Sequence, residues 1–261
     1  MKRNYGWKPD LPDYRDKMYY SHLFKVSKLP VKVDLRSKCP PVVDQGNLGS
    51  CTGNSLAGAL GFIHNKELFS RLFIYYNERS EENDILQDNG AQLRTGIKTL
   101  SQYGAPSESL WPYVENQFSV KPNVASYSDA IKNKISSYYR IEGIDQAKHC
   151  LSEGFPFVMG FTVYDGFDSN MVAETGYLNF PVSSESVQGG HAVLCCGYGT
   201  VKDFIDVKYI TKYKLNDAEP VVLIKNSWGM GWGVFGTGYF TMPMTYFGNN
   251  NLVTDCWCIK G

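Results

Sequence analysis

Apolar residues recur at helical spacing in two stretches of the first half of the chain, one that starts at Cys51 and one over residues 91–103. The residues that keep this spacing are Leu56, Leu60 and Ile63 in the first stretch and Leu93, Ile97 and Leu100 in the second. Such spacing is typical of the buried face of a helix. The second helix is expected to end at Gly104, because glycine often follows the last turn of a helix and Pro106 comes soon after.

The second half of the chain has a different pattern. From Ser137 onward, short segments rich in apolar or β-branched residues are bounded by Gly, Pro or Asp, which predicts strands. The predicted strands are residues 138–144, 155–163, 191–198, 209–213, 221–226 and 238–242, with a short helix over 146–151 and an earlier strand at 31–35. Helices come first and strands second, which indicates an α+β fold of two lobes with a cleft between them.

On this pattern the chain divides into three parts. Residues 1–30 form an N-terminal arm that prolines interrupt and that has no useful helical period. Residues 31–122 form a mainly helical lobe, and residues 123–261 form a strand-rich lobe. The arm is either an extended segment held on the surface or a short lid over an active site.

Charge and composition exclude several classes of function. The 261 residues include 26 basic and 26 acidic ones, so the formal net charge is zero, and no run of Lys or Arg stands out. This balance argues against nucleic-acid or membrane-surface binding through bulk electrostatics. No stretch approaches the roughly 20 apolar residues of a membrane span, and the first residues lack the apolar run of a signal peptide. We expect a monomer.

The cysteines do not form a disulfide pattern. There are seven, an odd number, of which Cys195 and Cys196 are adjacent and Cys256 and Cys258 are two residues apart. Free thiols in a reducing compartment fit these spacings better than a disulfide framework. We therefore expect an intracellular protein, in the cytoplasm or in a virion.

Cys51 is the candidate nucleophile. A turn that contains Gly46 and Gly49 leads into it, and the predicted helix starts there. The first turn of a helix has unpaired N–H groups and the positive end of the helix dipole, which lower the pKa of a thiol. By itself the position is only suggestive, because most lone cysteines are buried and inert.

Among the four histidines, His191 has the most suitable context. It follows Gly189 and Gly190 and opens an apolar, strand-like run. A histidine at the start of such a strand can reach a partner across an adjoining cleft. Asn226 follows another predicted strand and precedes Ser227 and Trp228.

Three blocks in this order resemble the papain-like cysteine peptidases, the family of papain and the cathepsins. The matching blocks are Gln45-Gly46-x-x-Gly49-Ser50-Cys51, Gly190-His191-Ala192 and Lys225-Asn226-Ser227-Trp228-Gly229-x-Gly231-Trp232-Gly233. Residues 31–36 and 108–113 also look like landmarks of the family, so the resemblance covers roughly residues 31–260. His191 lies 140 residues after Cys51, within the family's range of about 130–150. The form without a signal peptide looks like bacterial or large-DNA-virus members.

The resemblance implies a thiol endopeptidase that needs no cofactor and no metal and acts on protein or peptide substrates. Cys51 would be the nucleophile, His191 the acid and base, and Asn226 the residue that orients the imidazole. Gln45 would donate to the oxyanion, and Trp228 would shield the His–Asn hydrogen bond from water. The alternatives are an acyl transferase with the same three residues and an inactive papain-like binding protein.

The chain departs from the family pattern at four places. Asn226 lies 175 residues after Cys51, which is too far for the family's range and indicates an insertion over residues 200–220. The resemblance implies cysteines, joined by a disulfide, at the positions of Leu48 and Asp88. Thr52 stands where the family has an aromatic residue. The long inhibitory propeptide is absent, which leaves residues 1–30 as a candidate autoinhibitory lid.

The resemblance also implies the residues that contact substrate. Gly90 and Ala91 would pair with the backbone of an extended peptide, and Gly190 would adjoin the reaction centre. Leu93 would line the S2 pocket. Asp255 would lie at the floor of that pocket, where an acid favours a basic P2 side chain.

Overall fold

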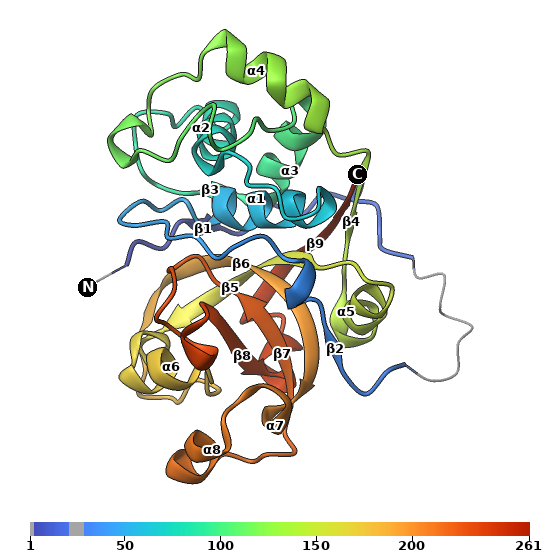
Figure 1. Ribbon diagram of the computed structural model, residues 1–261, viewed down its shortest axis with the longest axis vertical. Helices are drawn as coiled ribbons and strands as arrows, with labels where there is room; N and C mark the ends of the chain where they lie inside the picture. The colour runs from blue at the N-terminus through green and yellow to red at the C-terminus, as the bar shows by residue number, and fades with distance from the viewer. Residues whose placement is uncertain (1–2, 21–28) are drawn as a thin grey trace.

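The helix that begins at Cys51 lies at the centre of the computed structural model, which describes residues 3–20 and 29–261 (Figure 1). This helix, α1 (Cys51–Ile63), is buried over residues 51–61. Small residues let its neighbours approach closely: a Cβ on Gly53 would lie 2.7 Å from the carbonyl oxygen of Arg71, and one on Gly58 would lie 3.5 Å from Leu194. Helix α1 is therefore packed between other helices on one side and a sheet on the other.

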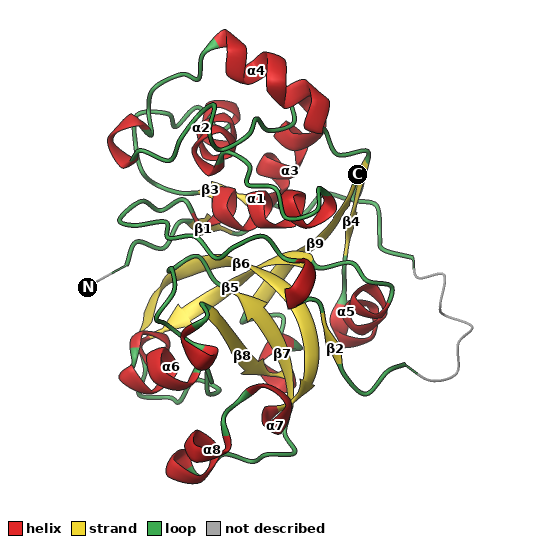
Figure 2. Cartoon of the chain, viewed as in Figure 1, coloured by secondary structure: helices red, strands yellow, loops and turns green. Residues whose placement is uncertain are grey.

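The helical lobe covers one side of α1 (Figure 2). Its helices are α2 (Arg71–Glu81), α3 (Leu93–Gln102) and α4 (Val124–Ala130). Helix α4 lies beyond the boundary predicted at residue 122, yet it packs on this lobe, because Tyr127 donates a 2.8 Å hydrogen bond to Asn77 and its ring contacts Phe73. In the described ranges, no helix combines the length and apolar character needed to cross a membrane.

The strand-rich lobe is built on an antiparallel sheet with the strand order β4-β9-β5-β6-β7-β8, and β2 pairs with β6. The strands are β2 (Val33–Asp34), β4 (Ser137–Arg140), β5 (Phe157–Tyr164), β6 (Val187–Thr200), β7 (Pro220–Lys225), β8 (Tyr239–Pro243) and β9 (Val253–Lys260). The helices around it are α5 (Gly143–Ser152), α6 (Asn170–Thr175) and α9 (Met244–Phe247). The predicted α+β arrangement is confirmed, whereas β9 was not predicted.

One predicted strand is wrong. Residues 209–213 belong to the helix α8 (Val207–Tyr213), which follows α7 (Val201–Phe204) in the segment between β6 and β7. The Asp206 side chain accepts a hydrogen bond from the Lys208 N–H and so caps the helix. No residue of α8 is buried, so its aromatic and β-branched side chains lack the packing that favours a strand. The segment lies between the two strands, where the sequence predicted an insertion.

The N-terminal arm enters the space between the two lobes. Its strand β1 (Trp7–Lys8) pairs in parallel with β3 (Ala91–Gln92) at the start of α3. Further along, Met18 forms a bridge with Arg140 of β4. Of the two alternatives for residues 1–30, the described part of the arm therefore fits the lid; residues 1–2 and 21–28 lie outside the described residues.

A buried arginine holds the loop that leads to β3. The guanidinium of Arg79 donates hydrogen bonds to the carbonyl oxygens of Ile85 (2.7 Å), Gln87 (3.1 Å) and Phe118, and it lies over the ring of Tyr75. The Arg79 side chain is among the largest that are fully buried. It thereby fixes the loop whose end presents Gly90 and Ala91 to the cleft.

We expect Arg79→Met to destabilise the protein by about 2–4 kcal/mol, because it removes a buried guanidinium that donates to three partly buried carbonyl groups. Equilibrium unfolding in urea measures this. The control Lys132→Met removes an exposed cation and should change the free energy of unfolding by less than about 0.5 kcal/mol. Equal effects of the two substitutions would contradict the assignment.

Candidate active site

Cys51 is the first residue of α1, and its side chain is fully buried. The turn before it is held from the side: the Asp88 carboxylate accepts a hydrogen bond from the Gly49 N–H at 3.0 Å and another from the Tyr75 hydroxyl at 2.6 Å. Asp88 stands where the resemblance implies a cysteine, and all seven cysteines of the chain are free. A charge-assisted hydrogen bond thus connects the two loops that the resemblance joins by a disulfide.

Thr52, the other departure next to the nucleophile, has a buried partner. Its hydroxyl donates a 2.7 Å hydrogen bond to the carboxyl group of Glu78 on α2. Complete burial raises the pKa of Glu78 well above its ordinary value. Burial therefore favours the neutral form of this carboxyl group.

His191 and Asn226 meet across β6 and β7. His191 Nε2 lies 2.8 Å from Asn226 Oδ1, and this oxygen also accepts from the Ser227 N–H at 2.8 Å. An amide oxygen can only accept, so we assign the ring proton to Nε2. His191 Nδ1 is buried and has no hydrogen-bond partner among residues 3–20 and 29–261. The ring therefore presents a free acceptor.

Aromatic rings surround the imidazole. The ring of Trp228 lies 5.4 Å from it, centroid to centroid, and Phe161 and Phe167 lie at 5.7 and 6.0 Å. Trp228 is 5% exposed. An apolar shell of this kind disfavours water around the His191–Asn226 hydrogen bond. The shielding role of Trp228 stays a prediction.

Hydrogen bonds fix the side chain of Gln45, which lies in the turn before Cys51. Its Oε1 accepts a hydrogen bond from the Ser227 hydroxyl at 2.6 Å, and its Nε2 donates to the Leu48 carbonyl at 2.9 Å. The same Nε2 donates to the carbonyl oxygen of Asn4 at 3.3 Å. An arm carbonyl group therefore engages the amide that was predicted to bind an oxyanion.

The arm occupies the cleft at the nucleophile itself. The backbone N–H groups of Ala192, Gly6 and Thr52 lie close enough to the Cys51 sulfur to lower its pKa, against the larger effect of burial. The Gly6 carbonyl accepts from the Ala91 N–H at 2.8 Å. A Cβ on Gly6 would lie 1.6 Å from the carbonyl oxygen of Gly49, so only glycine fits at this point of the arm.

Burial shifts the pKa values of Cys51 and His191 in the directions that favour their neutral forms. Desolvation raises the pKa of Cys51 to about 11, against the opposing effect of the nearby N–H groups. Desolvation also lowers the pKa of His191 to about 4, against the opposing hydrogen bond to Asn226. With the arm in place, the thiol and the imidazole are both uncharged over the physiological pH range.

The residues predicted to contact substrate lie along the arm. A Cβ on Gly90 would meet the Gly6 carbonyl at 1.8 Å, and one on Gly190 would meet Trp7 at 2.6 Å. Ala91 pairs with Trp7 in register. Leu93 is fully buried at the start of α3, within the same apolar cluster as Trp7.

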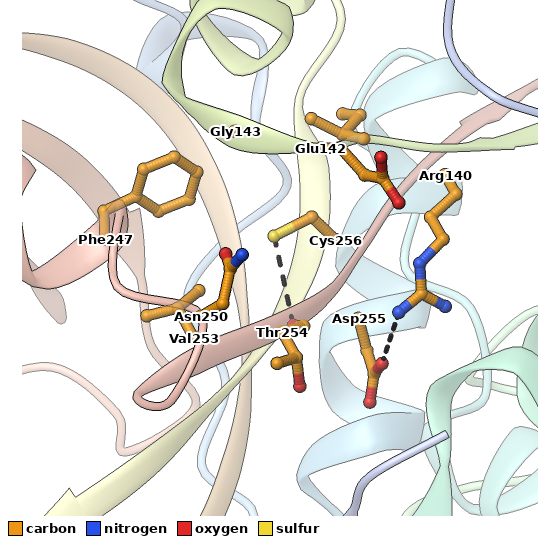
Figure 3. A pocket seen from close by; sticks show the side chains of 10 residues that line it. Arg140, Glu142, Gly143, Phe247, Asn250, Val253, Thr254, Asp255 and Cys256 are labelled. Atoms are coloured by element: carbon orange, nitrogen blue, oxygen red, sulfur yellow. Dashed lines mark hydrogen bonds and ion pairs between the residues drawn. The ribbon is translucent and has the colours of Figure 1, made fainter. Parts of the chain in front are cut away.

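Asp255, the predicted floor of the S2 pocket, is buried and paired. Its carboxylate accepts from the Arg140 guanidinium at 3.1 Å and from the Asp10 N–H at 2.7 Å, and the residue is 3% exposed. Figure 3 shows the carboxylate turned toward Arg140 at the wall of a cavity of about 340 Å³. Burial, with a contribution from Asp10, raises its pKa to about 6.

Two residues of this site escaped the sequence analysis, Gly6 and Trp7. The available signal was a glycine between two aromatic residues, Tyr5 and Trp7, within an arm that mixes charged and aromatic residues. Nothing in the spacing says which cleft such a segment enters.

Comparison with known proteins identifies the family of this chain. A family model described as papain family cysteine protease matches residues 29–256. An uncharacterized peptidase C1-like protein of Acanthamoeba polyphaga mimivirus is 38% identical over 291 aligned positions, which cover 100% of this chain and 88% of the relative. The thiol protease aleurain of Arabidopsis thaliana is 27% identical over 230 positions, which cover 86% of this chain and 58% of aleurain.

Solved structures agree with these matches. Xylellain, a cysteine protease from Xylella fastidiosa, is 38% identical and superposes with a TM-score of 0.84, covering 100% of this chain and 98% of that one. ProCathepsin B from Trypanosoma congolense, at 18% identity, shares the fold with a TM-score of 0.74 over 99% of this chain and 86% of that one. The chain therefore belongs to the papain family of cysteine proteases and is a cysteine-type peptidase.

Proposed function

We propose that the chain is an endopeptidase that cleaves peptide bonds through a Cys51–His191–Asn226 acyl-enzyme mechanism. The observation that carries the proposal is the 2.8 Å His191–Asn226 hydrogen bond, which leaves the other ring nitrogen unpaired. The backbone N–H of the next residue, Ala192, is close enough to Cys51 to lower the pKa of its thiol, which supports the proposal that His191 acts on this thiol. The sequence contains no histidine-rich segment of the kind that would restrict the enzyme to chain ends.

In the first half of the reaction, Cys51 gives its proton to His191 Nδ1 and the sulfur attacks the substrate carbonyl carbon. The carbonyl oxygen becomes an oxyanion, to which Gln45 Nε2 and the Cys51 N–H donate. The C–N bond then breaks as the imidazolium protonates the leaving amine, and a thioester on Cys51 remains.

In the second half, His191 Nδ1 takes a proton from a water molecule that attacks the thioester carbonyl. The C–S bond breaks, the acid leaves and the sulfur recovers its proton from the imidazolium. Throughout, Asn226 Oδ1 accepts from Nε2 and keeps the ring in one tautomer and one orientation.

We further propose that the arm keeps this enzyme latent. The arm engages the Cys51 sulfur through the Gly6 N–H and the Gln45 amide through the Asn4 carbonyl. It offers the sulfur a donor, and with the arm bound a substrate carbonyl cannot reach the site. The neutral pair that results from burial is also less reactive than a thiolate beside an imidazolium.

Ion pairs and hydrogen bonds from both lobes anchor the arm. Asp16 pairs with Arg94 of α3 at 2.6 Å and with Arg140 of β4 at 3.3 Å. Asp10 accepts from the Arg94 N–H at 3.0 Å and from the indole N–H of Trp257 on β9 at 2.9 Å. Because these contacts are largely buried, they hold the arm more firmly than surface pairs would.

Gly6→Ala is expected to release the arm without touching a catalytic group. The added Cβ would collide with the Gly49 backbone, at a cost of about 1–3 kcal/mol, which favours the open form about 5- to 150-fold. The alkylation rate of Cys51 with iodoacetamide at pH 7, measured by peptide mass spectrometry, should rise by that factor.

The pH profile of alkylation and a control variant distinguish release of the arm from a general loosening of the fold. The covered thiol has a pKa of about 11 and is blocked by the arm, so both chains react through the open form. Both rates should therefore level off below about pH 9, where His191 holds an exposed thiolate, and the rate in Gly6→Ala should be higher at every pH. Tyr14→Ala, at a 99% exposed arm residue, should leave the rate unchanged. Equal profiles for Gly6→Ala and the unaltered chain would contradict latency.

In the Gly6→Ala chain, we expect Cys51→Ala to abolish hydrolysis and Gln45→Ala to lower kcat by about 10²–10³-fold, the usual cost of losing one oxyanion donor. The measurement is hydrolysis of a denatured protein under reducing conditions, with the products identified by mass spectrometry. Internal cleavage should predominate. Gln102→Ala, at an exposed position on α3, should have no effect. Persistent turnover in Cys51→Ala would exclude the mechanism, and products larger than the substrates would indicate acyl transfer.

A further inference from the structure

Three carboxylates and two guanidinium groups meet on the path of the arm. The arm contributes Asp10 and Asp16, and the two lobes contribute Arg94 of α3, Arg140 of β4 and Asp255 of β9. Asp16 pairs with Arg94 at 2.6 Å and with Arg140 at 3.3 Å, and Asp255 pairs with Arg140 at 3.1 Å. With all five groups ionised, three negative and two positive charges leave this cluster with a net charge of −1. The two cations therefore cannot neutralise all three acids.

Asp10 is the acid without a cation in contact, and it lies against a second acid. Its backbone N–H donates a 2.7 Å hydrogen bond to Asp255 Oδ2. Its own carboxylate accepts from the Arg94 backbone N–H at 3.0 Å and from the Trp257 indole N–H at 2.9 Å. Both donors are neutral, and among the described residues no ion pair is formed by Asp10. The surplus negative charge thus falls on the Asp10–Asp255 pair.

Neighbouring ionisable groups do not supply the missing cation. Further ionisable side chains line the two cavities beside the cluster, Glu142 and Cys256 in one (Figure 3) and Asp13, Arg15, Lys17 and Lys98 in the other. Arg15 is paired with Asp13 within the arm, and burial raises the pKa of Cys256, which keeps this thiol neutral. Within residues 3–20 and 29–261, neither lysine forms an ion pair with an acid of the cluster.

A docked arm favours a proton on the Asp10–Asp255 pair. Burial raises the pKa of both residues. The charge of Asp10 raises the pKa of Asp255 by more than the Asp10 N–H lowers it, and the result is a pKa of about 6. Once the arm leaves, each acid gains water and loses the other as a neighbour, and an exposed aspartate has a pKa of about 4. Docking of the arm therefore takes up about one proton between pH 4 and 6.

Other groups that the arm covers do not cancel this uptake. Cys51 and His191 hold one proton between them in the closed form, as thiol and imidazole, and one in the open form, as thiolate and imidazolium. Against the effect of burial, Arg3 lowers the pKa of Asp44, so this ion pair contributes no proton above about pH 4.

We propose that this cluster is a proton-operated latch: the arm docks with one additional proton on the Asp10–Asp255 pair, so acid holds the arm closed and a rise to neutral pH releases it. The inference rests on the proposed latency and names the signal that ends it. The sign follows from linkage, because a group with a raised pKa in the closed form stabilises that form at low pH. This stabilisation is lost as the pH rises through about 6.

The test follows the alkylation of Cys51 by iodoacetamide in the full-length chain from pH 5 to 8 at constant ionic strength. In the unaltered chain the rate should rise about tenfold between pH 5 and 7 and then stay level, because opening releases one proton. Asp255→Asn keeps an oxygen that accepts from Arg140 but has no charge, as in the protonated acid. Its rate should remain within about twofold of the unaltered chain's value at pH 5 over the whole range.

The matched control is Asp13→Asn, the same substitution in the arm itself. Asp13 pairs with Arg15, which also belongs to the arm, so docking does not change its partner. This variant should keep the tenfold rise. A rise that persists in Asp255→Asn, or a rate in the unaltered chain that is flat or falls between pH 5 and 7, would overturn the latch.

A direct titration is independent of alkylation. In a chain with ¹³C-labelled aspartate, the carboxyl signal of Asp255, assigned by its loss in Asp255→Asn, should titrate near pH 6. A midpoint near pH 4 in the unaltered chain would overturn the latch.

The outcomes also separate the latch from the proposals on which it rests. Faster alkylation in Gly6→Ala without any rise between pH 5 and 7 in the unaltered chain would overturn the latch and uphold latency. The expected pH dependence without hydrolysis of any peptide would uphold the latch and overturn the peptidase mechanism.

Discussion

The close packing of α1 is the constraint on which the rest of the structure depends. Glycine and alanine residues allow α2 to approach this helix on one side and β6 on the other, as at Gly53 and Gly58. Because α1 begins at Cys51, that packing sets where the thiol lies relative to the strands that carry His191 and Asn226. Bulkier residues would push the two lobes apart and open the distance across which a proton must pass.

The arm in the cleft between the lobes explains how, under the proposed latency, the chain holds a reactive thiol in an unreactive form. The arm excludes water from the sulfur and the imidazole, and desolvation then favours the neutral form of each. On this account, activity depends on the fraction of molecules in which the arm has left the cleft. Any event that moves the arm admits water and substrate to the site together. The glycine contact at Gly6 and the ring contact at Trp7 hold the arm on opposite walls of the cleft, so both lobes would contribute to the proposed latency.

The sequence predicted the residues of the candidate reaction centre better than the path of the N-terminal arm that covers them. Periodicity placed α1 and α3, and the motif blocks identified Gln45, His191 and Asn226. The structure joins His191 to Asn226 and Gln45 to Ser227 by hydrogen bonds. Strand propensity failed at residues 209–213, because an exposed insertion gives aromatic residues nothing to pack against. The path of the arm depends on contacts between residues far apart in sequence, such as Trp7 with Gly160. No local pattern encodes such contacts.

The measurement that tests the account most directly is trapping of the acyl-enzyme. The Gly6→Ala chain would be mixed with a peptide ester, quenched in acid within milliseconds and weighed intact, and the adduct would be located by peptide mapping. The account predicts one acyl group per chain, on Cys51, with none in the Cys51→Ala version and far less in the chain whose arm is unaltered. An adduct at another residue, or equal labelling of the released and unaltered chains, would contradict it.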